Sequence, residues 1–245
     1  LGLRSITRRR HLKFALFAGA VAMLVLALAQ PMVGQKMEKA RARFLRWADH
    51  DEVLRLYDEA IGGTGSQVVM DMIDASAMLW RLHLRGVAVG ERFGPLADRW
   101  DEHWVTAGGA GQYAFNDLHA MIAFVGADRS QAQQAVVQAQ QAALHSPADN
   151  AAFTREVGQP ATLAIQAFGH GDYARAVSLL RPVRSVAHRF GGSHAQRDLL
   201  DLTLIEAASR SGDKPLAAAL AAERVALKPR SPLAQRLAAR HRVVG

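Results

Sequence analysis

The chain has 245 residues and no cysteine, half of its residues are hydrophobic, and its formal net charge is +8. This length is sufficient for one sizeable core or one array of repeats, and the apolar content excludes a disordered chain. The absence of cysteine excludes disulfides, thiolate metal ligands and a cysteine nucleophile. The chain is therefore a folded protein whose chemistry must come from other side chains.

The positive charge is concentrated at the N-terminus. Residues 1–46 contain ten Lys and Arg residues against one acid, Glu38, so the rest of the chain is left with a net charge close to zero. Proteins that bind the phosphate backbone obtain much of their affinity from clustered cations. A nearly neutral body does not fit that class, and we predict no nucleic-acid partner.

The first predicted element is an apolar segment that runs from Phe14 to Ala29 without a polar side chain. A helix that spans a bilayer needs about 20 apolar residues, so this segment would have to include its flanks. Three arginines precede it and small residues end it, which also suits a signal peptide. We predict a separate segment over residues 1–36 that attaches to a membrane or directs export through residues 14–33, with a buried helix as the alternative. The chain would then be membrane-anchored, and otherwise cytoplasmic.

From residue 37 onward the sequence indicates helices throughout. Alanine, leucine, glutamine and arginine dominate, and apolar and polar residues do not alternate over the length of a strand. Turn signals recur near residues 48, 86, 126, 171 and 212, about forty residues apart. This spacing is typical of stacked helix pairs. We predict an all-α, tetratricopeptide-like α-solenoid of antiparallel helix pairs over residues 37–245, preceded by the N-terminal apolar helix.

Polar clusters interrupt the aliphatic helices at three places, each in the first helix of a predicted pair. First helices line the concave face of such arrays, where ligands bind. We therefore predict a non-catalytic interaction module that binds a peptide or a partner protein on this face. The candidate contact residues are Trp80, Arg81, Asn116, Asp117, His119, Arg197 and Asp198.

The stretch GGSHA at residues 191–195 is one residue away from the G-x-S-x-G pattern of serine hydrolases. In that alternative Ser193 is the nucleophile and His119 the base, oriented by Asp117 or Asp198. However, a nucleophile elbow follows a strand, whereas an amphipathic helix precedes this serine. Ser193 and Gln196 instead match a capping box, the pattern S-x-x-Q that begins a helix. We favour the cap.

Structural alternatives also exist for the other polar residues. Asn116 and Asp117 suit the N-terminus of the helix in which they lie, because side-chain oxygens and negative charge both stabilise that end. Arg197 and Asp198 could form an ion pair that keeps neighbouring units in register. The ten histidines are scattered, without an HExxH motif or a Walker loop, so we predict no metal and no cofactor. A small-molecule pocket within the array is a further alternative.

Four motifs in series resemble the tetratricopeptide repeat protein 38 family. They are LWRLHLRGVAVGERF (79–93), AFNDLHAMIAFVGA (114–127), GGSHAQRD (191–198) and ERVALKPRSPLAQRL (223–237). The resemblance runs from about Asp51 to the C-terminus. It implies a tetratricopeptide-like superhelix without an established catalytic activity, in a family whose members are ordinarily soluble and cytoplasmic. It also implies that the chain corresponds mainly to the C-terminal half of that family.

Overall fold

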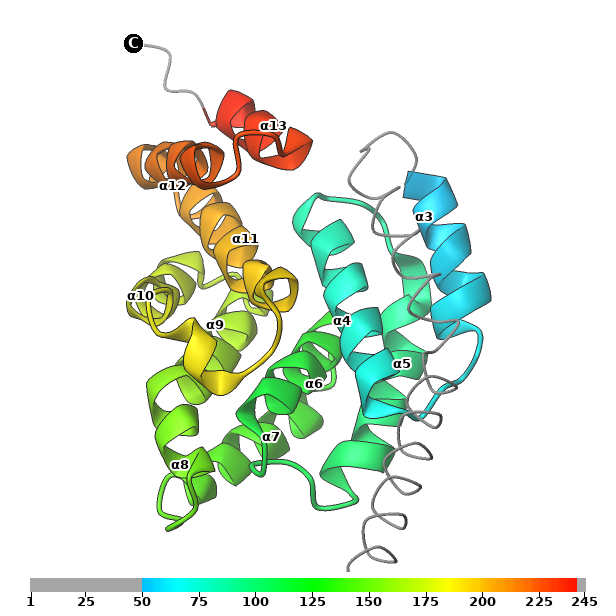
Figure 1. Cartoon of the computed structure of the whole chain (residues 1–245). Coiled ribbons are helices and arrows are strands. Elements are labelled where there is room, and N and C mark those ends of the chain that lie inside the picture. Colours follow the sequence, from blue (N-terminus) through cyan, green and yellow to red (C-terminus); the bar gives the residue numbers. More distant parts are fainter. Residues whose placement is uncertain (1–49, 242–245) are drawn as a thin grey trace, which may run out of the picture. The chain divides into compact units, whose positions relative to one another are not determined.

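The structure, a computed structural model, describes residues 50–241, and in this range every regular element is a helix. The predicted all-α class is confirmed for these residues, and the helices pack in sequential pairs (Figure 1). The apolar segment predicted at residues 14–33 and the turn predicted near residue 48 lie outside the described residues. Within residues 50–241, no helix is both long and apolar enough to cross a membrane.

Four helix pairs account for most of the described chain. Each pair consists of two helices joined by a short turn, at or next to the positions that the sequence predicts. The pairs are α4 (Val69–Leu84) with α5 (Phe93–Trp100), α6 (Ala114–Gly126) with α7 (Ser130–Ala143), α9 (Gln159–Gly169) with α10 (Tyr173–Val183), and α11 (His194–Arg210) with α12 (Lys214–Leu227). Before them lies α3 (His50–Tyr57), and after them α13 (Pro232–Arg240).

Two of the turns repeat the same local chemistry. Gly171 and Gly212 have φ angles of +79° and +85°, a left-handed conformation that ends a helix and favours glycine. The next residue in each case, Asp172 or Asp213, accepts a hydrogen bond from a backbone amide in the first turn of the following helix. The pair Gly-Asp therefore both ends one helix and caps the next.

Three helices are extended by a five-residue π-helical segment, in which the hydrogen bonds span five residues instead of four. The segments are η1 (Asp58–Gly62) after α3, η3 (Asp101–Val105) after α5, and η4 (Thr154–Gly158) between α8 (Asn150–Phe153) and α9. Short 3-10 helices, η2 (Gly90–Arg92) and η5 (Ala187–Phe190), precede α5 and follow α10. The longest spacing between predicted turns, from residue 126 to residue 171, contains α8 and η4.

The core is continuous between the pairs because the first helices pack on one another. Helix α6 packs against both α4 and α9, and α11 packs against α10 and also against α4 (Figure 1). The contact between α4 and α11 joins the first pair to the fourth, so part of the face formed by the first helices is closed. The core consists of large aliphatic and aromatic side chains that are almost completely buried, among them Leu79, Trp80, Phe124, Phe168, Leu199 and Leu204.

Candidate functional site

Trp80 lies inside the contact between α4 and α11 and has no exposed surface. Its indole Nε1–H donates a hydrogen bond of 3.0 Å to Oγ1 of Thr203 on α11. The ring also stacks on His83 and meets Phe168 edge-on, with centroids 5.2 and 5.5 Å apart. Trp80 therefore joins the first pair to the third and fourth, and it is not available as the surface contact that the sequence suggested.

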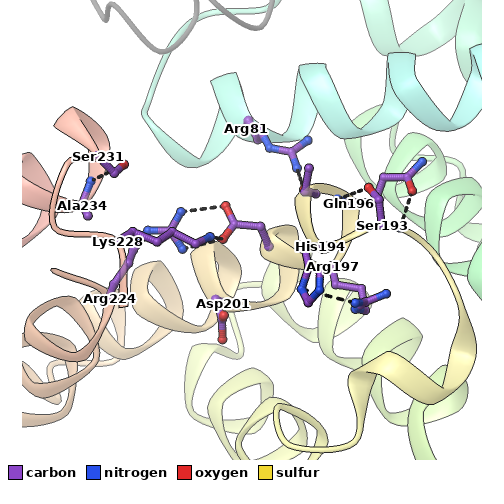
Figure 2. A network of polar contacts seen from close by, with 12 residues as sticks. Arg81, Ser193, His194, Gln196, Arg197, Asp201, Arg224, Lys228, Ser231 and Ala234 are labelled. Carbon is purple, nitrogen blue, oxygen red and sulfur yellow. Dashed lines mark hydrogen bonds and ion pairs between the residues drawn. The ribbon is translucent and has the colours of Figure 1, made fainter. Parts of the chain in front are cut away.

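Arg81, the next residue on α4, reaches the beginning of α11 (Figure 2). Its guanidinium donates to the carbonyl of Ala195 at 2.6 Å and to the carbonyl of Ala77 in its own helix at 2.9 Å. Arg81 is half-buried at the edge of the face formed by the first helices.

Asp117 on α6 is completely buried and is the centre of a polar cluster. Its carboxylate accepts hydrogen bonds from the Trp104 indole at 2.8 Å, from the Gly111 amide at 3.1 and 3.2 Å, and from Gln140 Nε2 at 3.2 Å. Gln140 also donates to Thr162 on α9. The cluster links α6, α7, α9, η3 and the loop before α6, so Asp117 joins elements of the fold and does not face a ligand on the surface.

The pKa of the Asp117 carboxyl is raised from its ordinary value of 3.8 to about 6. Burial is the main cause, because a charged carboxylate loses the stabilisation that water provides. The hydrogen bonds from Trp104, Gly111 and Gln140 favour the charged form and offset burial only in part. A buried acid held by neutral donors thus becomes protonated under mildly acidic conditions.

His119 lies two residues further along α6 and is also completely buried. Its Nδ1–H donates to the carbonyl of Phe115 at 2.8 Å, and its Nε2 has no hydrogen-bond partner. Burial lowers the pKa of this imidazole to about 4. Asn116 is buried on the same helix, which begins at Ala114 without a side-chain cap. The alternative of an Asn116 cap is therefore wrong.

Ser193 begins α11, and the predicted capping box is present. The serine hydroxyl accepts from the Gln196 amide at 3.3 Å, and the Gln196 side chain accepts from the Ser193 amide at 2.7 Å (Figure 2). The same hydroxyl does not reach the hydrogen-bonding distance of the His119 imidazole, whose Nε2 is buried without a partner. The nucleophile and base of the hydrolase alternative are not brought together in this arrangement.

The two glycines before Ser193 pack against the start of α6. Their φ angles are +93° and +75°, and a side chain at Gly191 would overlap the Tyr113 hydroxyl, while one at Gly192 would overlap the Phe115 ring. Arg197 donates hydrogen bonds to the carbonyl oxygens of both glycines. Arg197 thus holds the loop between the third and fourth pairs, and its guanidinium does not pair with Asp198.

Asp198 instead pairs with Arg224 of α12, the second helix of its own pair, and with Lys228, the residue that follows α12. Arg224 donates to its two carboxylate oxygens at 2.8 and 2.6 Å, and Lys228 approaches to 2.5 Å. Burial alone would raise the pKa of Asp198, but the hydrogen bonds and charges of Arg224 and Lys228 outweigh it and lower the pKa below 3.8. The predicted ion pair between Arg197 and Asp198 is replaced by one that locks α11 to α12.

A cleft lies where α4, α11 and α13 meet. Most of the charged residues that line it were not among the candidates from the sequence. Arg81 is the one candidate that lines it. Glu206 of α11 is buried at its edge and is held by Arg210 at 2.8 Å and by Arg240 at 3.0 Å. The lining consists of the aliphatic residues Leu84, Leu202, Ile205, Leu233 and Leu237 and the charged residues Arg81, Arg85, Glu206, Arg236 and Arg240.

A second hollow lies beside the Asp117 cluster, between the loop before α6 and α7. Its volume is about 380 Å³, within the size range of small-molecule sites. The lining is mostly alanine and glycine, with Gln112, Ser146 and Asn150 as polar residues and no ionisable side chain. Ligand sites combine apolar walls with a few convergent polar groups, and the cleft beside α13 fits that description better.

Residues 50–241 contain no group of three or more His, Asp or Glu side chains that could hold a metal ion. No family model matches the chain, and no solved structure matches it. The geometry of the described residues is therefore what supports a function. Most of the polar residues that the sequence singles out act inside the fold, whereas Arg81 lines the cleft between α4, α11 and α13.

Proposed function

We propose that the chain is a non-catalytic, tetratricopeptide-like binding module that engages a partner protein at the cleft between α4, α11 and α13. The single observation that carries the proposal is this cleft, in which charged rims border an aliphatic floor at the face formed by first helices. The four helix pairs with repeated turn chemistry support the tetratricopeptide-like assignment. The resemblance to the tetratricopeptide repeat protein 38 family remains a prediction.

Most of the candidate residues from the sequence are buried or engaged within the fold, so few of them can belong to the partner surface. Trp80, Asp117 and His119 are inaccessible to a ligand, and Arg197 and Asp198 are engaged by the Gly191–Gly192 carbonyls and by α12. Arg81 is the one candidate whose side chain lines an open site. The partner surface is therefore smaller than the sequence suggests, and it is displaced toward the C-terminal helix.

Site-specific photo-crosslinking in cells tests this proposal. A photoreactive amino acid replaces Ala239, which is exposed on α13 and does not line the cleft, so every lining side chain is retained. The matched control places the same group at Ala174, an exposed position on α10. We expect adducts to one defined segment of another protein from position 239 and not from position 174. Identical adducts at both positions, or none at position 239, would contradict the proposal.

A further inference from the structure

The Asp117 carboxylate is surrounded by hydrogen-bond donors. The Trp104 indole and the Gly111 amide donate to Oδ1, and Gly111 and Gln140 Nε2 donate to Oδ2. A charged carboxylate, which only accepts hydrogen bonds, suits this arrangement. A protonated carboxyl group instead carries one O–H donor, and that donor needs an acceptor. None of the three donor atoms around Asp117 can provide one.

Among the three donors, Gln140 alone can change from donor to acceptor. Indole and backbone N–H groups have no lone pair, whereas the side-chain amide of glutamine carries a carbonyl oxygen beside its NH2 group. Gln140 is completely buried, and its Oε1 has no hydrogen-bond partner among the described residues. Rotation of the amide by half a turn exchanges Oε1 and Nε2 with almost no change in shape. The unused acceptor would then face Oδ2 of Asp117.

Thr162 on α9 is compatible with both orientations of the Gln140 amide. In the structure Gln140 Nε2 donates to the Thr162 hydroxyl at 3.1 Å. After the rotation the same hydroxyl can donate to Oε1, because a hydroxyl both donates and accepts. In each orientation Gln140 thus makes two hydrogen bonds, one with Asp117 and one with Thr162, and one amide atom is left without a partner. The protonation state of Asp117 therefore decides which orientation is favoured.

No charged side chain among residues 50–241 pairs with Asp117, whose pKa reflects burial and the three neutral donors. Helices α7 and α9, which contain Gln140 and Thr162, have no ionisable residue. On α6 itself, His119 has a pKa of about 4 and is neutral at higher pH. The ionisable residues of the other elements around α6 are Asp71, Asp74, Arg81 and His83 of α4, Asp98 and Arg99 of α5, Asp101, Glu102 and His103 of η3, Tyr113 of the preceding loop, and Arg155 and Glu156 of η4. None of them is a cause of the pKa shift, so Gln140 is the partner that must respond to the proton.

We propose that the Gln140 amide is a pH-sensitive switch, which turns Nε2 toward Asp117 when the carboxyl is charged and Oε1 toward it when the carboxyl is protonated. The change extends over α6, α7 and α9, because Thr162 changes from acceptor to donor. Trp104 and Gly111 keep Oδ1 as their acceptor in both states, so the loop before α6 stays in place. None of these residues lines the cleft beside α13, and the switch does not depend on the proposed partner-binding function.

Solution NMR of the full chain, labelled with 13C and 15N and titrated from pH 8 to pH 4.5, tests the proposal. The Asp117 carboxyl carbon reports the proton, and nuclear Overhauser effects between the Gln140 NH2 hydrogens and the Thr162 side chain report the amide orientation. We expect the carboxyl to titrate near pH 6 and these Overhauser effects to weaken with the same midpoint. Overhauser effects that stay constant while the carboxyl titrates, or a carboxyl that remains charged at pH 4.5, would overturn the switch.

A second glutamine of α7 provides the matched control. Gln133 is also buried, but its Nε2 donates to the Phe124 carbonyl and its Oε1 accepts from Gln166, so its amide should keep one orientation at every pH. Asp117→Asn imitates the protonated carboxyl, because the asparagine NH2 can donate to Oε1 of Gln140. We expect this variant to show the low-pH pattern of Overhauser effects throughout the titration. The high-pH pattern in Asp117→Asn, or an equal change at Gln133 in the wild-type chain, would contradict the proposal.

Discussion

Asp117 and Asp198 lie in two regions of the molecule that shift the pKa of a carboxyl group in opposite directions. Asp117, in the cluster around α6, is held by an indole, a backbone amide and a glutamine, all neutral, and its pKa rises to about 6. Asp198, between α11 and α12, is held by Arg224 and Lys228, and its pKa falls below 3.8. Burial acts in the same direction at both sites, so the charge of the partners accounts for the difference.

This comparison shows why a polar residue in a helix does not by itself indicate a binding site. Both acids join helices, and neither is presented to a ligand. They differ in how much stability is lost when each is removed and in how the pH changes their contribution to stability. A buried pair that loses one ion leaves the other charge uncompensated, whereas loss of Asp117 leaves neutral donors without an acceptor.

The largest loss of stability is expected for Asp198→Ala. This change leaves the Arg224 guanidinium, whose side chain is 7 % exposed, without its carboxylate. Breaking a buried ion pair from one side costs about 3–5 kcal/mol, so we expect the free energy of unfolding in urea to fall by that amount.

Asp201→Ala is the matched control for this change, on the same helix. Asp201 pairs with Arg184 where the carboxylate is 40 % exposed, and Arg184 keeps Glu223 as a second partner. An exposed pair contributes about 0–1 kcal/mol. An equal loss of stability in both variants would contradict the distinction between the α11–α12 pair and an ordinary surface pair.

The next largest effect is a pH dependence of the free energy of unfolding, with opposite sign for Asp117 and Asp198. The folded pKa of Asp117 lies above its ordinary value, so the folded state binds the proton more tightly and Asp117 contributes stability that is present at low pH and lost as the pH rises through about 6. A shift of about two units corresponds to about 3 kcal/mol. Relative to Asp117→Asn, the wild-type chain should therefore gain up to about 3 kcal/mol between pH 7 and pH 4.

Asp198→Asn should show the reverse in the same titration. Because the folded pKa of Asp198 is lowered, its contribution is present at neutral pH and is lost as the pH falls below about 4. His119→Gln tests the same pH dependence at a second buried group of α6. The folded pKa of His119 is about 4, so its contribution is also lost as the pH falls from about 6.5 toward 4. If Asp117→Asn and Asp198→Asn had parallel pH profiles, the difference between the two regions would be refuted.

A smaller effect is expected at Ser193, where the helix cap and the nucleophile make different predictions. Ser193→Ala should lower the free energy of unfolding by about 1 kcal/mol, the usual cost of losing a cap. Ser193→Asp should restore the stability, because aspartate caps helices as well as serine does. Thermal or urea unfolding of the two variants provides the measurement. If Ser193→Ala left the free energy of unfolding unchanged, the capping box would not stabilise α11.

The local features of the fold were predictable from the sequence because they depend on residues close together in the chain. Gly171 and Gly212 need a left-handed conformation at the helix ends, and the aspartates that follow them are suited to capping. Ser193 and Gln196 form their capping box over three residues. In each case the partners lie within one helical turn, so their spacing alone indicates the contact.

The long-range partners could not be predicted in this way. Trp80 bonds to Thr203 across 123 positions of the chain, and Asp117 meets Gln140 from another helix. The sequence did contain one signal for the burial of Asp117 and His119. Helix α6, AFNDLHAMIAFVG, is apolar on nearly all sides, as is typical of a helix that is covered all round. The cleft required the register of three separate helices, which no local pattern specifies.

The first and fourth helix pairs close on each other through the contact between α4 and α11. A double-mutant cycle with Trp80→Phe and Thr203→Val tests it most directly, because these side chains form the buried hydrogen bond between the two helices. Residues in contact show coupling energies of about 0.5–3 kcal/mol, whereas distant sites add independently. We predict a coupling of about 1 kcal/mol in urea unfolding. Additive effects of the two changes would contradict the closure.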